Sequence, residues 1–331
     1  MVGPFRLDSE IASGAFGKVF RATHRDEGYV VAIKIARSRA TAAYQLINEF
    51  IVLKRVNELF PHAGFPLVRW IGEHNDDTFL AMELLGPDLH TLLQRAPQHR
   101  FSLKTVLMVG VQLTDCLEQL HTSHYLHCDL KPENIVVRLE GAQQQVCLLD
   151  LGLTHLFWDS ATATHAPIQV YDHFNGTAKY ASINAHEFLE PSRRDDLEAL
   201  LFVLLYLLSG TLPWEHIQDP ESHLYEAMIP LKQDPRRLPA LAHVDGEFFD
   251  CLHQVRLLHF DETPDYARLR DTLRACAKRR GLLSEYELTT GTWDWQQLDW
   301  VLPTQTSTPT PATMPSSRPP RKPFQAARLL G

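Results

Sequence analysis

The order of hydrophobic and polar positions divides the chain into a strand-rich beginning and a longer helical part. Short apolar runs rich in β-branched and aromatic residues are typical of buried strands, and they occur at 30–35, 79–85, 135–137 and 146–149. Apolar residues at helical spacing predict helices at 41–59, 102–124 and 193–209. A small part made of strands around one helix, followed by a mainly helical part, predicts the α+β class.

The end of the chain has a different composition from the rest. Residues 303–331 contain seven prolines, many serines and threonines, and few large apolar residues. Such a segment buries too little apolar surface to offset the entropy of ordering, so we expect a disordered tail. Its Pro320-Arg321-Lys322-Pro323 segment has the P-x-x-P spacing of an SH3 ligand, but a chance match is the simpler interpretation in so proline-rich a tail.

Composition and charge exclude several classes of protein. With 331 residues, of which 44% are hydrophobic and 22% charged, the chain can form a sizeable core, which excludes collagenous, fibrous and wholly disordered proteins. The net charge is −8, and because the tail carries cations and no acid, the body is more acidic still. An acidic body argues against nucleic acid as the main partner.

The cysteines and the longest apolar stretch indicate an intracellular protein without a membrane span. Five scattered cysteines without a C-x-x-C pair favour reduced thiols over disulfides or a structural zinc site. The first residues lack the apolar run of a secretory signal. The stretch 197–208 contains Glu198 and is shorter than the roughly 17 residues that span a bilayer, so it reads as a buried helix. We expect a cytoplasmic or nuclear location, or both.

A glycine-containing segment, 11–19 (IASGAFGKV), lies between two predicted strands. Gly14 and Gly17 would let backbone N–H groups approach phosphate groups closely. The phosphate loop of protein kinases follows G-x-G-x-x-G-x-V, and Ala12 stands here in place of the first glycine. Considered alone, the segment is explained more simply by a hairpin turn.

A lysine and a glutamate each stand in an apolar setting. Lys34 ends the run V-A-I-K of a predicted strand, where a lone lysine usually lies at a sheet edge and faces water. Glu49, however, comes three residues after Leu46 and four before Leu53, on the apolar stripe of the predicted helix. Because a buried carboxylate and a buried lysine each need a partner, we expect a Lys34–Glu49 pair that directs the ammonium at nucleotide phosphates.

The strongest local signal is the segment 127–134 (HCDLKPEN), which matches H-x-D-x-x-x-x-N between a helix and a strand. This spacing lets Asp129 meet a substrate hydroxyl and Asn134 face a metal, while Lys131 would offset charge on the transferred phosphate. The strand 146–149 then ends in Asp150, a hard oxygen ligand that suits Mg²⁺. Each carboxylate alone is compatible with a solvated turn, but five matches in the right order make coincidence improbable.

Residues 5–302 resemble the casein kinase 1 family of eukaryotic Ser/Thr protein kinases. Four motifs carry the resemblance: Ser182-Ile183-Asn184 in place of the usual Ala-Pro-Glu, the helix start 193–198 (RRDDLE), the turn 212–214 (LPW) and the late helical region 260–266 (FDETPDY). The resemblance implies a bilobal kinase fold with a β-rich N-lobe, a mainly helical C-lobe and a tail, at 5–85, 86–302 and 303–331. It also implies an enzyme that transfers the ATP γ-phosphate to Ser and Thr of protein substrates.

The resemblance also implies roles for individual residues. Lys34, oriented by Glu49, would hold the α- and β-phosphates, Asp129 would be the base, and Lys131 would contact the γ-phosphate. Asn134 and Asp150 would be the Mg²⁺ ligands. The ATP site would further comprise glycine-loop, adenine-slot and hinge residues: Ile11, Gly14, Gly17, Val19, Ala32, Met82, Glu83, Leu85 and Leu149. Asp196 would brace the catalytic loop.

Three departures from the family leave alternatives open. Ala12 replaces a loop glycine, Cys128 stands where the family has arginine, and 215–227 lacks the family's basic stretch, which serves acidic or phosphorylated substrates. Ala12 and Cys128 are compatible with a pseudokinase that keeps the fold as a binding scaffold. A small-molecule phosphotransferase is disfavoured, because it would not need the motifs that build a platform for a protein substrate.

Overall fold

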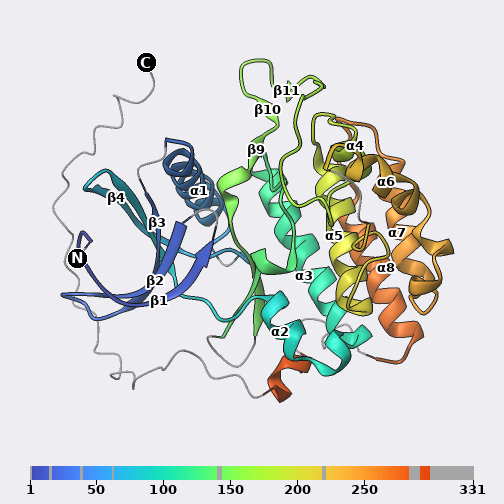
Figure 1. The fold of residues 1–331 in the computed structure, drawn as a ribbon, viewed down its shortest axis with the longest axis horizontal. Helices are drawn as coiled ribbons and strands as arrows, with labels where there is room; N and C mark the ends of the chain where they lie inside the picture. Colours follow the sequence, from blue (N-terminus) through green and yellow to red (C-terminus); the bar gives the residue numbers. More distant parts are fainter. Residues whose placement is uncertain are drawn as a thin grey trace. The chain divides into compact units, whose positions relative to one another are not determined.

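The strands near the N-terminus form one antiparallel sheet in the computed structural model, which describes residues 2–14, 17–37, 40–61, 63–139, 144–217, 221–282 and 291–298. The strands are β1 (Phe5–Gly14), β2 (Gly17–His24), β3 (Val30–Ala36), β4 (Val68–His74) and β5 (Asp77–Glu83). They lie in the order β1-β2-β3-β5-β4, with every neighbouring pair antiparallel (Figure 1).

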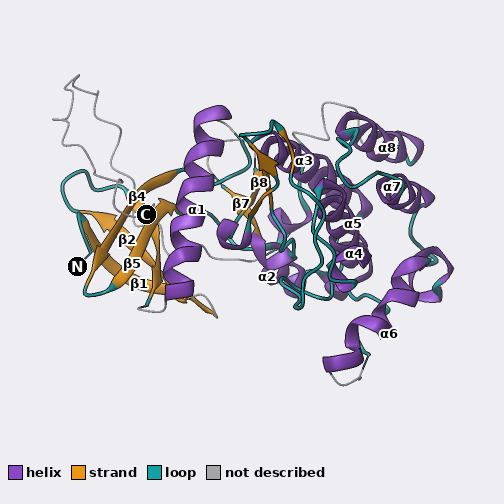
Figure 2. Ribbon diagram, turned by 90° about the horizontal axis from the view of Figure 1, so that it is seen from above, coloured by secondary structure: helices purple, strands orange, loops and turns teal. Residues whose placement is uncertain are grey.

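The central strand β3 buries alternate residues on the two faces of the sheet. Val31 and Ile33 belong to the apolar cluster on one face. Ala32 belongs to the cluster on the other face, together with residues of helix α1 (Ala40–Leu59), which lies along the sheet (Figure 2). Because side chains alternate along a strand, Lys34 lies on the same face as Ala32, toward α1.

Helices make up most of the chain after the sheet (Figure 1). They are α2 (Leu89–Arg95), α3 (Leu103–Thr122), α4 (Ile183–His186), α5 (Arg193–Ser209), α6 (Glu221–Gln233), α7 (Gly246–Arg256) and α8 (Tyr266–Arg279). Helix α5 packs against α3 and α7 and is buried almost all round, as its apolar run predicts. Helix α3 also packs against α8, so α3 and α5 form the centre of the helical part.

Three short strand pairs shape the segments between α3 and α4. β6 (Tyr125–Leu126) pairs with β9 (His155–Leu156), β7 (Ile135–Arg138) with β8 (Gln145–Leu148), and β10 (Trp158–Asp159) with β11 (Thr164–His165). The segment 127–134 therefore runs between β6 and β7, and β8 leads directly to Asp150. Residues 140–143 lie outside the described residues.

The prediction of a bilobal α+β fold is confirmed, with the sheet and α1 in the N-lobe and the other helices in the C-lobe (Figure 1). The predicted strands and helices are present, with small shifts at their ends. The segment 260–266, which the resemblance places in the late helical region, forms a turn at 260–265 that leads into α8. Asp265 caps α8 by accepting a hydrogen bond from Arg268 N at 2.9 Å, so the helix begins only at Tyr266.

The described residues belong to one compact unit that extends to Leu298. The predicted tail 303–331 and its P-x-x-P segment lie outside the described residues. In the part of the chain that the structure describes, no helix is both long enough and apolar enough to cross a membrane.

Candidate active site

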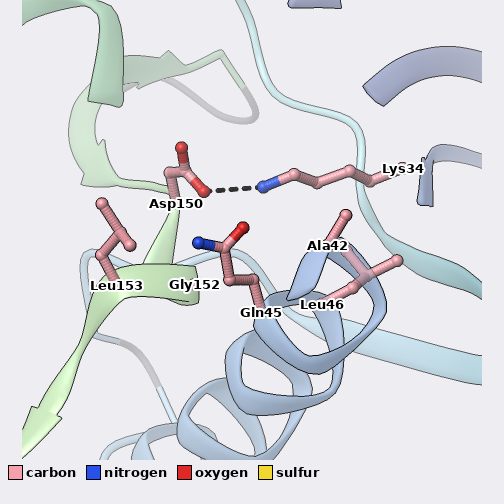
Figure 3. A pocket seen from close by; sticks show the side chains of 7 residues that line it. All are labelled: Lys34, Ala42, Gln45, Leu46, Asp150, Gly152 and Leu153. Atoms are coloured by element: carbon pink, nitrogen blue, oxygen red, sulfur yellow. Dashed lines mark hydrogen bonds and ion pairs between the residues drawn. The ribbon is translucent and has the colours of Figure 1, made fainter. Parts of the chain in front are cut away.

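Lys34 lies between two carboxylates that come from different lobes. Its Nζ donates to Glu49 Oε2 of α1 at 2.8 Å and to Asp150 Oδ1 at 2.7 Å. Figure 3 shows Lys34 extending toward Asp150 at a small pocket that residues of α1 and of the turn after Asp150 also line. Glu49 is buried, with 1% of its surface exposed, so it needs a cationic partner. The structure thus forms the predicted Lys34–Glu49 pair and adds Asp150 to it.

Pairing and burial act against each other at these three groups. Burial alone would lower the pKa of Lys34, but Glu49 and Asp150 raise it above its ordinary value. Burial would raise the pKa of Asp150, but Lys34 lowers it. At Glu49 burial dominates and raises the pKa despite the lysine. Lys34 therefore stays protonated at neutral pH and presents a fixed positive charge at the pocket.

Helix α1 is held against the Asp150 segment by contacts that do not involve Lys34. Asn48 Nδ2 donates to Thr154 Oγ1 at 2.9 Å. A Cβ atom at Gly152 would lie 3.3 Å from Cβ of Gln45, tighter than an ordinary contact. Gly152, two residues after Asp150, thus allows α1, which carries Glu49, to approach this segment closely.

The carboxylate of Asp129 is buried and is held through both oxygens. Oδ1 accepts a hydrogen bond from Thr177 Oγ1 at 2.7 Å, and Oδ2 accepts one from Lys131 Nζ at 2.5 Å. Asn134 Nδ2 donates to the main-chain carbonyl of Asp129 at 2.9 Å. These bonds bring together the predicted residues Asp129, Lys131 and Asn134, and they add Thr177 from a segment far along the chain.

Asn134 and Asp150 supply the oxygen atoms that could bind a metal ion. Leu149 N donates to the carbonyl of Asn134 at 2.8 Å, which places the two predicted ligands on adjoining segments. Because the amide nitrogen of Asn134 is bonded to Asp129, its amide oxygen is the atom left for a cation. The side chain of Asp150 is 22% exposed, and Oδ2 is not the atom bonded to Lys34. Both donors are hard oxygens, which fits Mg²⁺.

The predicted adenine-site residues are only partly gathered together. Four of them lie in one apolar cluster with Leu46 and Leu80: Ile11, Val19, Ala32 and Met82. Leu85 and Leu149 are half-buried and do not belong to this cluster among the described residues. The cluster covers the face of the sheet next to Lys34, where an apolar ring would be buried.

The glycine segment forms the end of the β1–β2 hairpin, so the hairpin interpretation and the glycine-loop interpretation describe the same structure. Gly14 pairs with Gly17 across the two strands, and Ala15 and Phe16 lie outside the described residues. Gly17 has φ +126°, and a Cβ atom there would lie 2.0 Å from the carbonyl oxygen of Ile35. Only glycine fits this position.

The side chain of Glu83, a predicted hinge residue, is bonded to the C-lobe. Arg138 of β7 donates to it through Nε at 2.7 Å and through Nη2 at 2.9 Å. The same guanidinium donates to the carbonyls of Ala63 and Phe65, at 3.3 and 2.7 Å. Arg138 therefore ties the end of β5, the loop before β4 and strand β7 together.

The side chain of Asp196, near the start of α5, binds main-chain N–H groups of the segment 127–134, which we call the catalytic loop. Its carboxylate accepts from His127 N at 2.7 Å and from Cys128 N at 2.9 Å. His121 Nε2 lies 2.9 Å from the same carboxylate, and His121 Nδ1 lies 2.6 Å from the hydroxyl of Tyr266. Burial would raise the pKa of Asp196, but the bonds from His121 and from the loop lower it. The carboxylate is therefore charged and positions the loop, as predicted.

The adjacent Asp195 binds the segment 177–186, which we call the substrate platform. Its carboxylate accepts from Ser182 Oγ at 2.7 Å and from Asn184 Nδ2 at 2.9 Å. It also accepts from Ser192 N, the residue before α5, at 2.8 Å, which is one of the two bonds of a capping box. The serine and asparagine of Ser-Ile-Asn thus bind the first aspartate of Arg-Arg-Asp-Asp, so two motifs found separately in the sequence form one structural unit.

The fully buried Lys232 of α6 binds the other side of the substrate platform. Its Nζ lies within hydrogen-bond distance of three acceptors: the carbonyls of Ala178 and Ala181, at 2.8 and 2.7 Å, and Nε2 of His186 at 2.9 Å. Trp214 adds a bond from its indole N–H to the carbonyl of Lys179 at 2.8 Å. The platform is therefore held by α5, α6 and the Leu-Pro-Trp turn together.

Four residues that position the site escaped the sequence reasoning: Asn48, Arg138, Thr177 and Lys232. Thr177 stands shortly before the Ser-Ile-Asn motif that the sequence does mark, so its hydroxyl is the one of the four with a local signal. The partners of Asn48, Arg138 and Lys232 are mostly main-chain carbonyls or groups in distant segments, which no pattern in the sequence predicts.

The comparison with protein families agrees with this geometry. Residues 5–261 match the family described as the protein kinase domain, a match that includes Lys34, Asp129 and Asp150. Because the match covers well over half of the chain, the chain belongs to the protein kinase family. This is a family of ATP-binding phosphotransferases that act on proteins.

We predict that Lys34→Met lowers the free energy of unfolding by about 3–5 kcal/mol, because Glu49 would remain buried without a cation. Urea denaturation of the two proteins measures the difference. The double variant Lys34→Met, Glu49→Leu should recover much of the loss, since it removes the unpaired charge. A single variant as stable as the wild type would contradict this account of the pair.

We predict that the stability conferred by Lys232 depends on pH. Burial lowers the pKa of Lys232 to about 7, well below the value near 10.5 of an unfolded chain, so the unfolded state binds more protons between these values. Stability relative to Lys232→Met should therefore rise by about 2 kcal/mol from pH 7 to pH 9. Urea denaturation at both pH values tests this.

The control for this comparison is Lys278→Met, which removes an exposed lysine of α8. Its stability relative to the wild type should not change over the same pH interval. Parallel pH profiles for the wild type and Lys232→Met would show that Lys232 keeps the ordinary pKa of a lysine in the folded protein.

Proposed function

We propose that the chain is an active protein Ser/Thr kinase related to the casein kinase 1 family, which uses ATP and Mg²⁺. The observation that carries the proposal is the complete set of charged groups at one site. Lys34 is bonded to Glu49 and Asp150, and a few residues away along the adjoining segments Asp129 is bonded to Lys131 and Thr177. The Lys34–Glu49 pair would also stabilise a binding scaffold of the same fold, but a scaffold would have no need of the bonds that orient Asp129.

Asp129 is the group best suited to accept the proton of a substrate hydroxyl. Its carboxylate is buried and oriented before substrate arrives, so little reorganisation accompanies the reaction. A general base of this kind contributes about 10²–10⁴-fold to the rate. Lys131, bonded to Asp129, is close enough to offset negative charge on the phosphoryl group as it is transferred.

Lys34, Asn134 and Asp150 suit the binding of the nucleotide and its metal ion. The charge of Lys34 would hold phosphate oxygens, and the free oxygens of Asn134 and Asp150 would hold Mg²⁺. When bound, the ion offsets the charge of the phosphates. The apolar cluster with Ala32 and Met82 supplies a surface for the adenine ring.

Specificity for Ser and Thr and the relation to casein kinase 1 are supported by the platform. Lys131 is the residue type that the resemblance associates with Ser/Thr kinases, and Thr177 bonds the base beside it. The bonds from Ser182 and Asn184 to Asp195 give the Ser-Ile-Asn motif a structural reason that matches the resemblance. A small-molecule phosphotransferase would have no use for such a platform.

The proposal predicts that the purified chain phosphorylates casein when incubated with labelled ATP and Mg²⁺, and that the label is on Ser or Thr. Asp129→Asn should lower kcat by about 10²–10⁴-fold, because the base is lost while the fold is kept. Asp150→Ala should abolish the label. The matched control is Asp26→Asn, an exposed aspartate in the β2–β3 turn, which should keep full activity. Labelling no stronger than that of Asp150→Ala would favour the scaffold interpretation.

The activation segment, 153–176, contacts the rest of the protein although a cysteine, Cys128, stands where a cation would serve it. Kinases that are switched on by phosphorylation of this segment pair the new phosphate with an arginine at the position of Cys128. Burial, together with the charge of Asp196, raises the pKa of the Cys128 thiol well above its ordinary value. The thiol is therefore neutral and cannot form such a pair with a phosphate. A Cβ atom at Gly176, which has φ +108°, would lie 2.7 Å from the carbonyl oxygen of Cys128. The end of the segment is therefore packed directly on the catalytic loop. His155 Nε2, within the segment, lies 2.8 Å from Oε1 of the buried Glu190.

We therefore predict that the kinase is active without phosphorylation of this segment. Protein treated with phosphatase, and the double variant Thr162→Ala, Thr164→Ala, should both retain most of the activity on casein. A loss of more than about tenfold, or roughly 1.4 kcal/mol of barrier, in either sample would reveal a phosphate switch.

A further inference from the structure

A groove beside Asp129 provides the surface along which a substrate chain would lie. It has a volume of about 480 Å³. Its lining residues belong to the platform, to the catalytic loop 127–134, to α2 and the residues after it, and to the end of α5 with the turn that follows. Thr177 lines the groove and at the same time donates to Asp129 Oδ1 at 2.7 Å. A peptide that presents a hydroxyl to Asp129 would therefore place its neighbouring side chains in this groove.

The groove contains more acidic than basic side chains, which is unusual for a site that binds an anion. Two carboxylates, Glu133 and Glu215, line it, and Lys179 is the one lysine or arginine among the lining residues that the structure describes. The other titratable groups there are the histidines 90, 99 and 216 and the tyrosines 180 and 206. Burial, together with the charges of Glu215 and Glu133, raises the pKa of Tyr206, which is what a negative potential in the groove does.

Lys179 is already bound within the protein. Its Nζ lies 2.5 Å from Glu215 Oε1 and 3.7 Å from the centre of the Tyr206 ring, and its side chain is 18% exposed. The other oxygen of Glu215 accepts a hydrogen bond from Thr211 Oγ1 at 2.9 Å, so both oxygens of the carboxylate are held. A phosphate or carboxylate of a substrate that approached Lys179 would meet a cation already paired with Glu215, and the charge of Glu215 would repel it.

Glu133 is the charged group of the groove that is most available to a substrate. Its side chain is 46% exposed, and Nδ1 of His90 lies 3.5 Å from its carboxylate, beyond a good hydrogen bond. A lysine or arginine side chain that entered the groove would meet Glu133 and the outer face of the Glu215–Lys179 pair. A negatively charged side chain of the peptide would be repelled by both carboxylates, Glu133 and Glu215.

We propose that this groove favours substrates with a basic side chain near the acceptor hydroxyl, and that Glu215 is the residue that makes phosphorylated or acidic sites poorer substrates, because it pairs with Lys179. The proposal rests on the proposed kinase function and names the substrate class of the same site. Glu215 acts here as a specificity-determining residue, because removing its charge would free Lys179 for an anion.

The test measures phosphorylation of a set of peptides that share one acceptor threonine. Each peptide is varied at a single position, and the varied position is moved through the residues before and after the threonine. That position carries arginine, glutamine, glutamate or phosphoserine. With the wild type we expect kcat/KM to be highest for an arginine peptide and lowest for phosphoserine. In Glu215→Gln the ratio of the phosphoserine peptide to the glutamine peptide should rise about tenfold, as one charge-assisted bond allows.

Two further variants make the result specific. Adding Lys179→Met to Glu215→Gln should abolish the gain, because the freed cation is gone. Glu73→Gln removes the same charge from an exposed position of β4 outside the groove and should leave every ratio as in the wild type. A wild type that prefers phosphoserine or glutamate, or an unchanged ratio in a folded Glu215→Gln protein, would overturn the proposal.

Failure of the kinase proposal gives a different result. In that case no peptide is phosphorylated by the wild type, and equilibrium binding of the same peptides, labelled with a fluorophore, tests the groove by itself. Tighter binding of the arginine peptide than of the phosphoserine peptide would support the assignment of the groove, and the reverse order would refute it.

Discussion

Two consecutive carboxylates buried at the start of α5, Asp195 and Asp196, set the positions of the segments that form the site. Removing a carboxylate from water costs several kcal/mol unless donors replace the lost hydration, so each aspartate must be surrounded by hydrogen-bond donors. Asp196 obtains them from the main chain of the catalytic loop and from His121, and Asp195 obtains them from the platform and from its own helix start. Because both belong to one buried helix, the proposed base and the surface that would present its substrate share a single rigid support.

The hydrogen bonds near the site also determine how charge is distributed around it. Lysines near the site bind acceptors of the protein itself: Lys131 binds Asp129, Lys179 binds Glu215, and Lys232 binds carbonyls of the platform. The cations thus serve the internal structure, and the groove beside the site is left with an excess of carboxylates. The acidic character of the whole chain, which the sequence shows, is in this way expressed at the place where a substrate would bind.

The fold and the charged residues of the site could be predicted because their signals are local. Glu49 stood out since a carboxylate on the apolar stripe of a helix needs a partner, and the buried run of α5 marked its helix within the correct bounds. Arg138 and Lys232 could not be found in this way. Their partners are main-chain carbonyls from distant segments, which look alike in every sequence, so only the folded chain shows that these cations are needed.

The guanidinium of Arg138 also has a consequence for motion between the lobes. It joins Glu83, where the last strand of the sheet ends, to β7 and to the loop that enters the sheet. A rotation of the N-lobe about Glu83 must therefore either carry β7 with it or break two charge-assisted bonds at once. The connection between the lobes is accordingly restrained, and a change in the angle between them would carry the energetic cost of breaking the bonds of Arg138 or of moving β7.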